Sequence, residues 1–376
     1  MRVCMLTTTH GPLDVRIFYK ESKSLSKFCE VVIVAPDEKA WEKAVGNVKI
    51  IAVKKPENKL LHFITLWRVL KEGLKQDCEV YHCHEPDSLM IGVILKLLKR
   101  NKVKLVYDAH EHWPSEIAYG WFKIRNKILR KVVEFLSLRI EQFLAKSADC
   151  IVVVSNSVGE RFRKISGFFL IPNVPLVDMI ENSDYEKNCE IVQMGGGIQS
   201  YHGINEIIFA LLKVRKHNSG VKLKIIGNVK ANIESIVEKH SLTKNVMFTG
   251  FRPFREMYEE IKKGKIGLVI MKSEFYNAYI GLPNKLFDYM LCELAVVASD
   301  YPEISKIVKR AKCGILVNPN NVEEIANAII YLLENPAEAR KMGVRGRGLV
   351  EREMNWEKME KKLIEIYRSF GRWKCE

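Results

Sequence analysis

Short apolar runs rich in β-branched residues alternate with helix-like segments along almost the whole chain of 376 residues. Such near-continuous apolar runs are typical of strands that are buried on both faces of a parallel sheet. Because helical patterns separate the runs, the sequence predicts an α/β fold. The runs that we expect to form strands are 3–6, 31–35, 80–83, 103–107 and 151–154, and then 191–194, 223–226, 246–248, 267–271, 295–298 and 314–317.

A break in this alternation divides the chain into two halves. The segment Ile171-Pro172-Asn173-Val174-Pro175 is extended and punctuated by proline, and a polar stretch over 182–188 follows it. The length also exceeds what one core usually supports, so we expect two domains. The predicted limits are 1–175 and 176–354, with an amphipathic helix in 355–376 that packs on either domain, including a return to the first.

Composition narrows the class of protein. Charged residues make up 28% of the chain and hydrophobic residues 47%, which is typical of a globular protein. We expect no cleaved signal peptide and no membrane span, because no window of about 18 residues is apolar and uncharged. The nine cysteines are scattered and form no C-x-x-C motif, which favours reduced thiols in a cytoplasmic protein over disulfides or a zinc site.

The chain is strongly basic, with a formal net charge of +15. This excess suggests an anionic partner such as a nucleotide, a nucleic acid or a lipid headgroup. The stretch 121–146 concentrates basic residues beside an apolar stripe that repeats every four residues from Ile124 to Leu144. We expect much of that stripe to pack on the sheet. The basic remainder fits either an anionic membrane surface or an ordinary solvated face.

A glycine-rich segment follows the expected strand 191–194. Gly195, Gly196 and Gly197 come first, and Gly203 opens the expected helix 204–214. Glycines let a backbone approach a phosphate closely, and a helix N-terminus favours negative charge. The spacing matches neither G-x-G-x-x-G nor a P-loop. The segment therefore fits either a phosphate site or a tight strand-to-helix turn.

The segment 282–289 is the second candidate for an anion site. Pro283 suits the first turn of a helix, which leaves backbone N–H groups unpaired beside Lys285. Asp288 follows one turn later, where its carboxylate can accept hydrogen bonds from ribose hydroxyls. The plainer interpretation is a capped amphipathic helix with a solvated lysine.

Histidines gather after two of the expected strands. His82 and His84 alternate at one strand end, while His110, Glu111 and His112 follow another. Strand ends in open α/β sheets are where ligands bind. Three interpretations remain open: a metal site, a polar substrate pocket, and histidines that are merely hydrogen-bonded beneath a loop.

Together these segments resemble the GT-B glycosyltransferases of the family 4 type, over nearly the whole chain. Residues 107–114 are similar to that family's D-x-H-E-x-x-P segment, and 171–173 to its interdomain I-P-N junction. Residues 195–203, with Gly227 and 283–300, resemble its donor-binding half. The resemblance implies two facing Rossmann-like domains with a deep cleft between them. It also implies retaining transfer from a nucleotide-diphosphate sugar without a metal or other cofactor.

The resemblance further implies a role for individual residues. His110, Lys285 and Asp288 take the catalytic positions, where His110 contacts the transferring sugar and Asp288 the ribose. The remaining positions fall into a donor set (Gly195, Gly196, Gly197, His202, Gly203, Gly227, Pro283 and Asn284) and an acceptor-side set (Asp14, Arg16, His84 and Glu111).

Two departures from the family pattern concern the donor site. The first glutamate of the usual E-x7-E pair is replaced by Ile280, and the second by Asp288. The basic pair of the glycine segment falls at Gly196 and His202. We infer that Lys285, together with the adjacent helix N-terminus, takes over the diphosphate contact. His202 can be protonated beside a diphosphate.

The predicted function is thus transfer of a sugar to a glycan or lipid-linked acceptor, in cell-surface polysaccharide or glycolipid synthesis. We expect a cytoplasmic protein, peripheral on the cytoplasmic membrane face if 121–146 meets lipid. The alternatives are a sugar-nucleotide 2-epimerase of the same fold, a non-catalytic homologue and a basic nucleic-acid-binding protein. The dispersed basic residues speak against nucleic acid as a partner.

Overall fold

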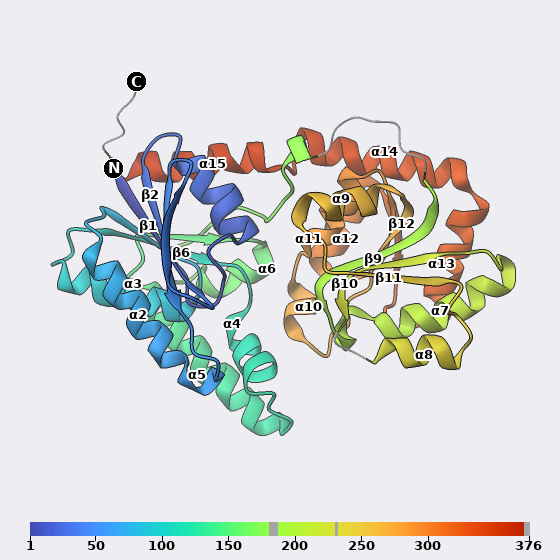
Figure 1. Ribbon diagram of the computed structural model, residues 1–376, viewed down its shortest axis with the longest axis horizontal. Helices are drawn as coiled ribbons and strands as arrows, with labels where there is room; N and C mark the ends of the chain where they lie inside the picture. Colours follow the sequence, from blue (N-terminus) through green and yellow to red (C-terminus); the bar gives the residue numbers. More distant parts are fainter. Residues whose placement is uncertain (180–186, 230–231, 372–376) are drawn as a thin grey trace. The chain divides into compact units, whose positions relative to one another are not determined.

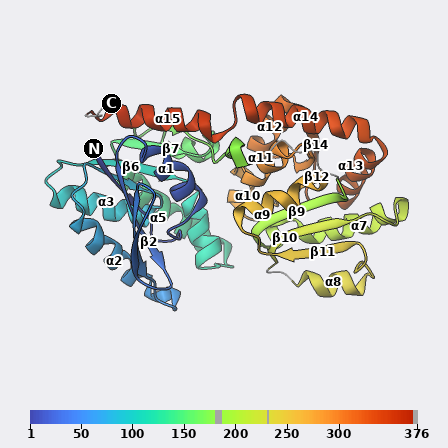
Figure 2. The ribbon, with the colours of Figure 1, turned by 45° about the horizontal axis from the view of Figure 1, so that its top comes forward.

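The computed structural model describes residues 1–179, 187–229 and 232–371 (Figure 1, Figure 2). The chain forms two compact units, Met1–Asn173 with Glu357–Glu376, and Val174–Trp356. Each unit holds one largely parallel sheet covered by helices, so the predicted pair of Rossmann-like α/β folds is confirmed. The predicted domain limits at 175 and 354 concern independent folding and stay predictions. Most of the polar stretch 182–188 lies outside the described residues.

The sheet of the first unit has the strand order β3-β4-β2-β1-β5-β6-β7-β8. Among the described residues its pairings are parallel except that of β3 with β4. The five expected strands are present, but the β3–β4 hairpin and β8 were not predicted. The strands are β1 Arg2–Leu6, β2 Glu30–Asp37, β3 Trp41–Val45, β4 Val48–Lys54, β5 Val80–Cys83, β6 Lys104–Ala109, β7 Cys150–Val153 and β8 Phe169–Leu170.

The helices of the first unit include the last helix of the chain. The Tyr367 hydroxyl of α15 lies 2.7 Å from His82 Nδ1 of β5, and Lys27 forms an ion pair with Glu360 at 2.5 Å. The helices are η1 Val15–Ser22 (π-helical), α1 Lys23–Leu25, η2 Lys59–Leu61, α2 His62–Lys75, α3 Pro86–Leu98, α4 Trp113–Ser115, η3 Glu116–Trp121 (π-helical), α5 Lys127–Ala145, α6 Asn156–Gly159, η4 Glu160–Phe162 and α15 Trp356–Ser369.

The apolar stripe of α5 does not lie where the sequence led us to expect it. Much of it was predicted to pack on the sheet, but Ile128, Val132, Leu136 and Ile140 are all exposed. The fully buried side chains of α5 are Glu141 and Ala145. Glu141 accepts a hydrogen bond from the Tyr107 hydroxyl at 2.6 Å, so a polar contact anchors this helix to β6.

The second unit has a six-stranded parallel sheet in the order β11-β10-β9-β12-β13-β14. Figures 1 and 2 show α7 and α8 on one side of this sheet and α11 and α12 on the other. The strands are β9 Cys189–Ile198, β10 Leu223–Val229, β11 Val246–Gly250, β12 Gly264–Val269, β13 Ala295–Ser299 and β14 Gly314–Val317. The helices are η5 Val177–Met179, η6 Ser200–His202, α7 Ile204–His217, α8 Ile233–Lys239, α9 Phe254–Lys262, α10 Tyr276–Ile280, α11 Asn284–Leu291, α12 Pro302–Ala311, α13 Val322–Glu334 and α14 Pro336–Arg352.

Both sheets have a topological switch point near their centre. The chain fills one side of each sheet first and then crosses to the other, between β1 and β5 in the first unit and between β9 and β12 in the second. Ligands of open α/β sheets bind beyond the carboxyl ends of strands at such points. Each unit therefore offers one favoured place for a site.

No helix among the described residues is both long enough and apolar enough to cross a bilayer. Eight cysteines in this part of the chain are free thiols, and the ninth, Cys375, lies outside the described residues.

The glycine segment differs from the predicted loop, because Gly195–Gly197 belong to β9, which continues to Ile198. The backbone of Gly227 in the adjacent β10 packs closely against this part of β9. Its φ is +115°, and a Cβ there would lie 1.8 Å from the Gly195 carbonyl oxygen. The two backbones can approach one another only because residue 227 lacks a side chain.

We therefore expect Gly227→Ala to destabilise the protein by roughly 2–4 kcal/mol, through steric overlap and backbone strain. Urea unfolding measures this loss. Gly196→Ala is the matched control, because a Cβ at 196 meets nothing within 4 Å. Equal stability of the two variants would contradict the role given to Gly227.

Candidate functional site

The site of the first unit is built around the buried guanidinium of Arg16. Its Nε and Nη2 donate to the two oxygens of Asp108 at 2.8 and 3.0 Å, and Nη1 donates to the Ile171 carbonyl at 3.1 Å. Although burial opposes a charge here, the Asp108 and Glu21 carboxylates raise the pKa of Arg16 above its ordinary value. Arg16 was predicted on the acceptor side. Its inward geometry suits it to position other groups.

The two carboxylates around Arg16 differ in their ionisation. Burial tends to raise the pKa of Asp108, but Arg16 and His110 outweigh it and hold that pKa well below its usual range. Glu21 lies 2.9 Å from Arg16 Nε, yet burial and the nearby Asp108 charge raise its pKa well above its usual range. The pKa values of these two carboxyl groups are thus shifted in opposite directions around one guanidinium.

His84 and His110 meet at the ends of β5 and β6. His110 Nε2 lies 3.0 Å from Asp108 Oδ2 and 3.3 Å from His84 Nδ1. Burial lowers the pKa of His110 to about 4, despite the attraction of Asp108. His110 is therefore neutral at pH 7, with an Nε2–H that is suited to donate to Asp108. The sequence placed these residues at strand ends, and the structure brings them together.

A second polar group extends this cluster toward β1. Asp14 caps η1 by accepting hydrogen bonds from the Arg16 and Ile17 amides, and it lies 3.2 Å from His10 Nδ1. Burial tends to lower the pKa of His10, but the contact with Asp14 and the charge of Glu85 raise it to about 9. His10 is thus a cation near His110, with ring centroids 5.4 Å apart.

His10 and Glu85 were not predicted from the sequence. Glu85 is fully buried and accepts hydrogen bonds from the Thr8 amide at 3.2 Å and the Thr9 hydroxyl at 2.8 Å. The signal was the polar run that directly follows the first strand, where ligands of such sheets gather. Glu111, in contrast, has an exposed side chain, and its carbonyl accepts a hydrogen bond from Arg161 at 2.7 Å.

The same cluster contains the atoms that would hold a metal ion. One ligand atom from each of Glu21, His82, His84 and Asp108 lies within 4.8 Å of the others. The His82 and His84 rings stack with centroids 4.6 Å apart, whereas the predicted convergence also involved His110 and His112. The Arg16 guanidinium contacts both carboxylates and already supplies positive charge at this point.

In the second unit, the carboxyl end of β9 carries the glycine segment. Gly196 is exposed, and Gly195 and Gly197 are half-buried. Gly203 has a φ of +62° directly before α7, and a Cβ there would lie 2.4 Å from Ile270 Cγ2. The end of β9 is therefore accessible, and α7 begins shortly after it, which is the chain order expected of a phosphate site.

Lys285 at the start of α11 is the main cation of the second unit's candidate site. Its side chain is only 6% exposed, and among the described residues no carboxylate lies within ion-pair distance. With the Gln193 amide nitrogen donating to the Leu268 carbonyl at 2.7 Å, the amide oxygen accepts a hydrogen bond from Lys285 Nζ at 3.1 Å. Burial lowers the pKa of Lys285 to about 7.

His202 lies close enough to Lys285 to sense its charge. Burial, assisted by Lys285, lowers the pKa of His202 to about 3. The Nδ1 atom accepts a hydrogen bond from the Gln199 amide at 2.9 Å, which leaves Nε2–H as a neutral donor. The imidazole is therefore neutral in this structure, and its protonation beside a diphosphate stays a prediction.

The remaining donor-side residues surround the first turn of α11. Pro283 precedes the helix at the cap position instead of within its first turn, and Asn284 is exposed. Asp288 is buried, and its Oδ1 accepts a hydrogen bond from the Tyr258 hydroxyl at 2.6 Å. Ile280, which replaces the family glutamate, is a buried apolar residue.

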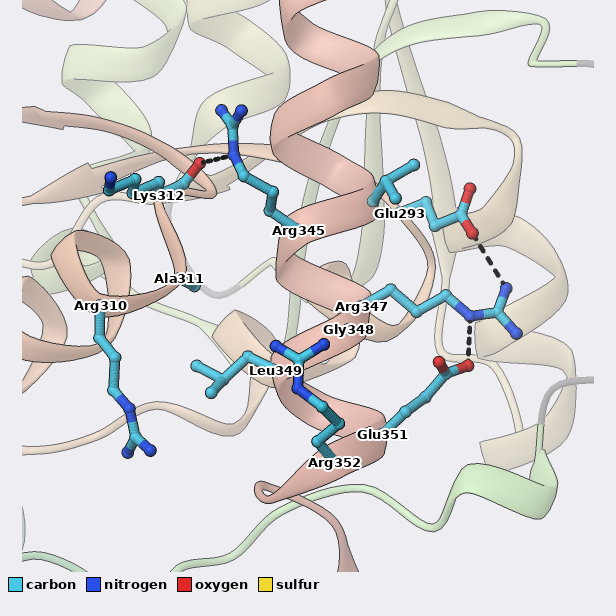
Figure 3. A pocket seen from close by; sticks show the side chains of 11 residues that line it. Glu293, Arg310, Ala311, Lys312, Arg345, Arg347, Gly348, Leu349, Glu351 and Arg352 are labelled. Carbon is cyan, nitrogen blue, oxygen red and sulfur yellow. Dashed lines mark hydrogen bonds and ion pairs between the residues drawn. The ribbon is translucent and has the colours of Figure 1, made fainter.

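A basic pocket of about 720 Å³ lies elsewhere in the second unit, between α12 and α14 (Figure 3). Arg347 bridges Glu293 and Glu351 at 3.2 and 2.6 Å, and Arg345 Nε donates to the Lys312 carbonyl at 2.8 Å. Lys312 lies two residues before β14, so this pocket lies at the amino end of a strand. It is therefore separate from the carboxyl ends of β9 and β12.

Two family descriptions match the two halves of the chain. “Glycosyltransferase Family 4” matches residues 7–173, and “Glycosyl transferases group 1” matches residues 179–349. A glycosyltransferase of Methanocaldococcus jannaschii is 22% identical over 321 residues, which cover 81% of this chain and 78% of that protein.

Solved structures with low sequence identity share the fold over almost the whole chain. Sucrose-phosphate synthase from Thermosynechococcus elongatus gives a TM-score of 0.78 at 17% identity, covering 98% of both chains. The Anabaena protein HepE in complex with UDP-glucose gives 0.71 at 15% identity, covering 98% of this chain and 100% of that one. The chain therefore belongs to the glycosyltransferases and is a GT-B enzyme of the family 4 type.

Proposed function

We propose that this glycosyltransferase moves a sugar from a nucleotide-diphosphate donor to a glycan or lipid-linked acceptor with retention of anomeric configuration. One observation carries the donor half of this proposal. Lys285 is a buried cation without a carboxylate partner, and it lies in the unit that also holds the exposed glycine strand end. A buried, unpaired charge is costly unless a ligand completes it, and a diphosphate supplies the missing negative charge.

The residues of the donor set contribute different interactions with the diphosphate. Lys285 supplies the charge, His202 donates a neutral N–H, and the amides of Gly195–Gly197 and the Gly203 helix start donate the remaining hydrogen bonds. Gly227 permits the close backbone packing at this point. Pro283 and Asn284 form the N-terminus of α11, which we assign to the donor. Asp288 is assigned to the ribose, held in place by Tyr258.

In the transfer itself, the bond between the anomeric carbon and the diphosphate oxygen breaks while the acceptor oxygen attacks the same face. The acceptor proton passes to the departing diphosphate. Because an oxocarbenium-like sugar needs no protein nucleophile, stabilisation of the leaving group and positioning supply the catalysis. Lys285 provides that stabilisation without a metal in our proposal.

The first unit supplies the sugar and acceptor contacts. His110 is neutral and is oriented by Asp108, so it can hydrogen-bond the transferring sugar without adding a charge near the developing cation. Asp14, His84 and Glu111 are assigned to the acceptor side. Arg16 acts through Asp108 as a positioning residue. A role in cell-surface polysaccharide or glycolipid synthesis at the cytoplasmic membrane face follows if the acceptor is lipid-linked.

Lys285→Met should weaken binding of the nucleotide-sugar donor by about 10- to 100-fold, because a charge-assisted contact is lost. Calorimetry with UDP-glucose, GDP-mannose and ADP-glucose identifies the donor and then measures the loss. Lys306→Met is the matched control, since Lys306 is an exposed lysine of the same unit. Unchanged donor affinity in Lys285→Met would reject the diphosphate role.

Donor binding should also weaken as the pH rises from 6.5 to 8.5. Lys285 has a pKa of about 7, so it is largely protonated at the lower pH and largely neutral at the higher one. Binding of an anion to the protonated form alone predicts a fall of about 20-fold over this range. The dependence should be absent in Lys285→Met, and a wild-type affinity that does not change with pH would contradict this prediction.

The stereochemical proposal has a direct measurement. Proton NMR of the product reports the anomeric configuration, which should equal that of the donor. Inversion would exclude the front-face mechanism, while an isomeric sugar nucleotide formed without acceptor would indicate the epimerase alternative.

A further inference from the structure

The outward face of α5 is a continuous apolar surface. Ile128, Ile140 and Phe143 are 76%, 61% and 71% exposed, and further large apolar side chains lie between them at helical spacing. Monomeric proteins rarely expose so many large apolar residues on one helix face. The complete set on α5 is Ile128, Leu129, Val132, Phe135, Leu136, Ile140 and Phe143.

This surface continues beyond α5 into neighbouring elements. Trp121 and Phe122 are exposed just before the helix, and Trp121 contacts His62 at the start of α2, with ring centroids 5.0 Å apart. The exposed apolar residues of η2 and α2 include Leu60, Phe63 and Trp67. Since α3 packs against both α2 and α5, all these elements belong to one layer of the first unit (Figure 1).

Basic residues border the apolar surface. In the described part of the chain, the five basic residues of 123–131 have no carboxylate partner. Arg139 has none either, and it stacks on Phe135 with its guanidinium carbon 5.1 Å from the ring centroid. The only carboxylate on α5 besides the buried Glu141 belongs to Glu134. The five unpaired cations are Lys123, Arg125, Lys127, Arg130 and Lys131.

We propose that this surface docks the enzyme onto an anionic lipid bilayer. An apolar stripe with exposed tryptophans and a basic border matches the acyl boundary and the anionic headgroups of such a membrane. α5 has 19 residues and is amphipathic, so it lies in the plane of the surface over about 28 Å and does not cross it. A second copy of the chain fits less well, because a two-fold contact would bring the same cations together.

This inference deepens the proposed function, since it names the surface that would bring the enzyme to a lipid-linked acceptor. Only the identity of the acceptor rests on the proposed function; membrane binding itself does not. Vesicle binding needs neither donor nor acceptor. A loss of vesicle binding with intact transfer to a soluble acceptor, or the reverse, therefore separates failure of one proposal from failure of the other.

The test is flotation of the purified enzyme with phosphatidylcholine vesicles, with and without phosphatidylglycerol. We expect the wild type to bind the anionic vesicles preferentially. Ile140→Ser with Phe143→Ser should lower binding more than about tenfold, because apolar area is no longer inserted. Lys127→Gln with Arg130→Gln and Lys131→Gln should lower binding to anionic vesicles by about 100-fold and abolish the lipid preference.

Phe251→Ser is the matched control, because Phe251 is 64% exposed but belongs to the second unit. Its vesicle binding should equal that of the wild type, and circular dichroism checks that every variant is folded. Unchanged vesicle binding of the double serine variant would overturn the proposal. The proposal would also be overturned if the wild type bound no vesicles and sedimented as a dimer without lipid, and if the double serine variant sedimented as a monomer.

Discussion

The buried guanidinium of Arg16 holds together three segments of the first unit that are far apart in the chain. It joins η1 to Asp108 at the end of β6 and to the Ile171 carbonyl. Removing one partner of such a pair leaves a buried charge uncompensated, which typically costs about 3–5 kcal/mol. The neutral His110 is oriented by the same Asp108. The candidate acceptor side is therefore positioned by the Arg16–Asp108 ion pair and the hydrogen bond between Asp108 and His110 at the strand ends.

The second unit uses the opposite arrangement. Lys285 is also buried, but it contacts the neutral amide of Gln193 instead of a carboxylate. A lowered pKa is the expected result of burial without a counter-charge. A buried cation without a counter-charge is stabilised by a bound anion. In our proposal this difference separates Arg16, which positions other groups, from Lys285, which binds the diphosphate.

The sequence predicted those secondary structure elements that a local residue pattern determines. The central strands were found because buried parallel strands are apolar along their whole length, whereas β3 was missed because Glu42 and Lys43 interrupt its apolar residues. Contacts between distant residues were not predictable. Nothing near Gly195 reveals that the Gly227 backbone approaches it, and nothing near His10 reveals Glu85. Periodicity likewise showed that α5 has an apolar face but not that the face is exposed.

The basic residues behind the net charge of +15 can now be grouped by their environment. Arg16 is buried and paired, so its charge contributes to folding. Lys285 is buried without a carboxylate partner in the described residues, and we propose that its charge serves a diphosphate. The cations around α5 are exposed and unpaired beside apolar side chains, and this combination suits an anionic interface better than bulk water. The proposed donor site and the proposed lipid surface therefore use different elements, α11 and α5, so substitutions can test each without changing the other.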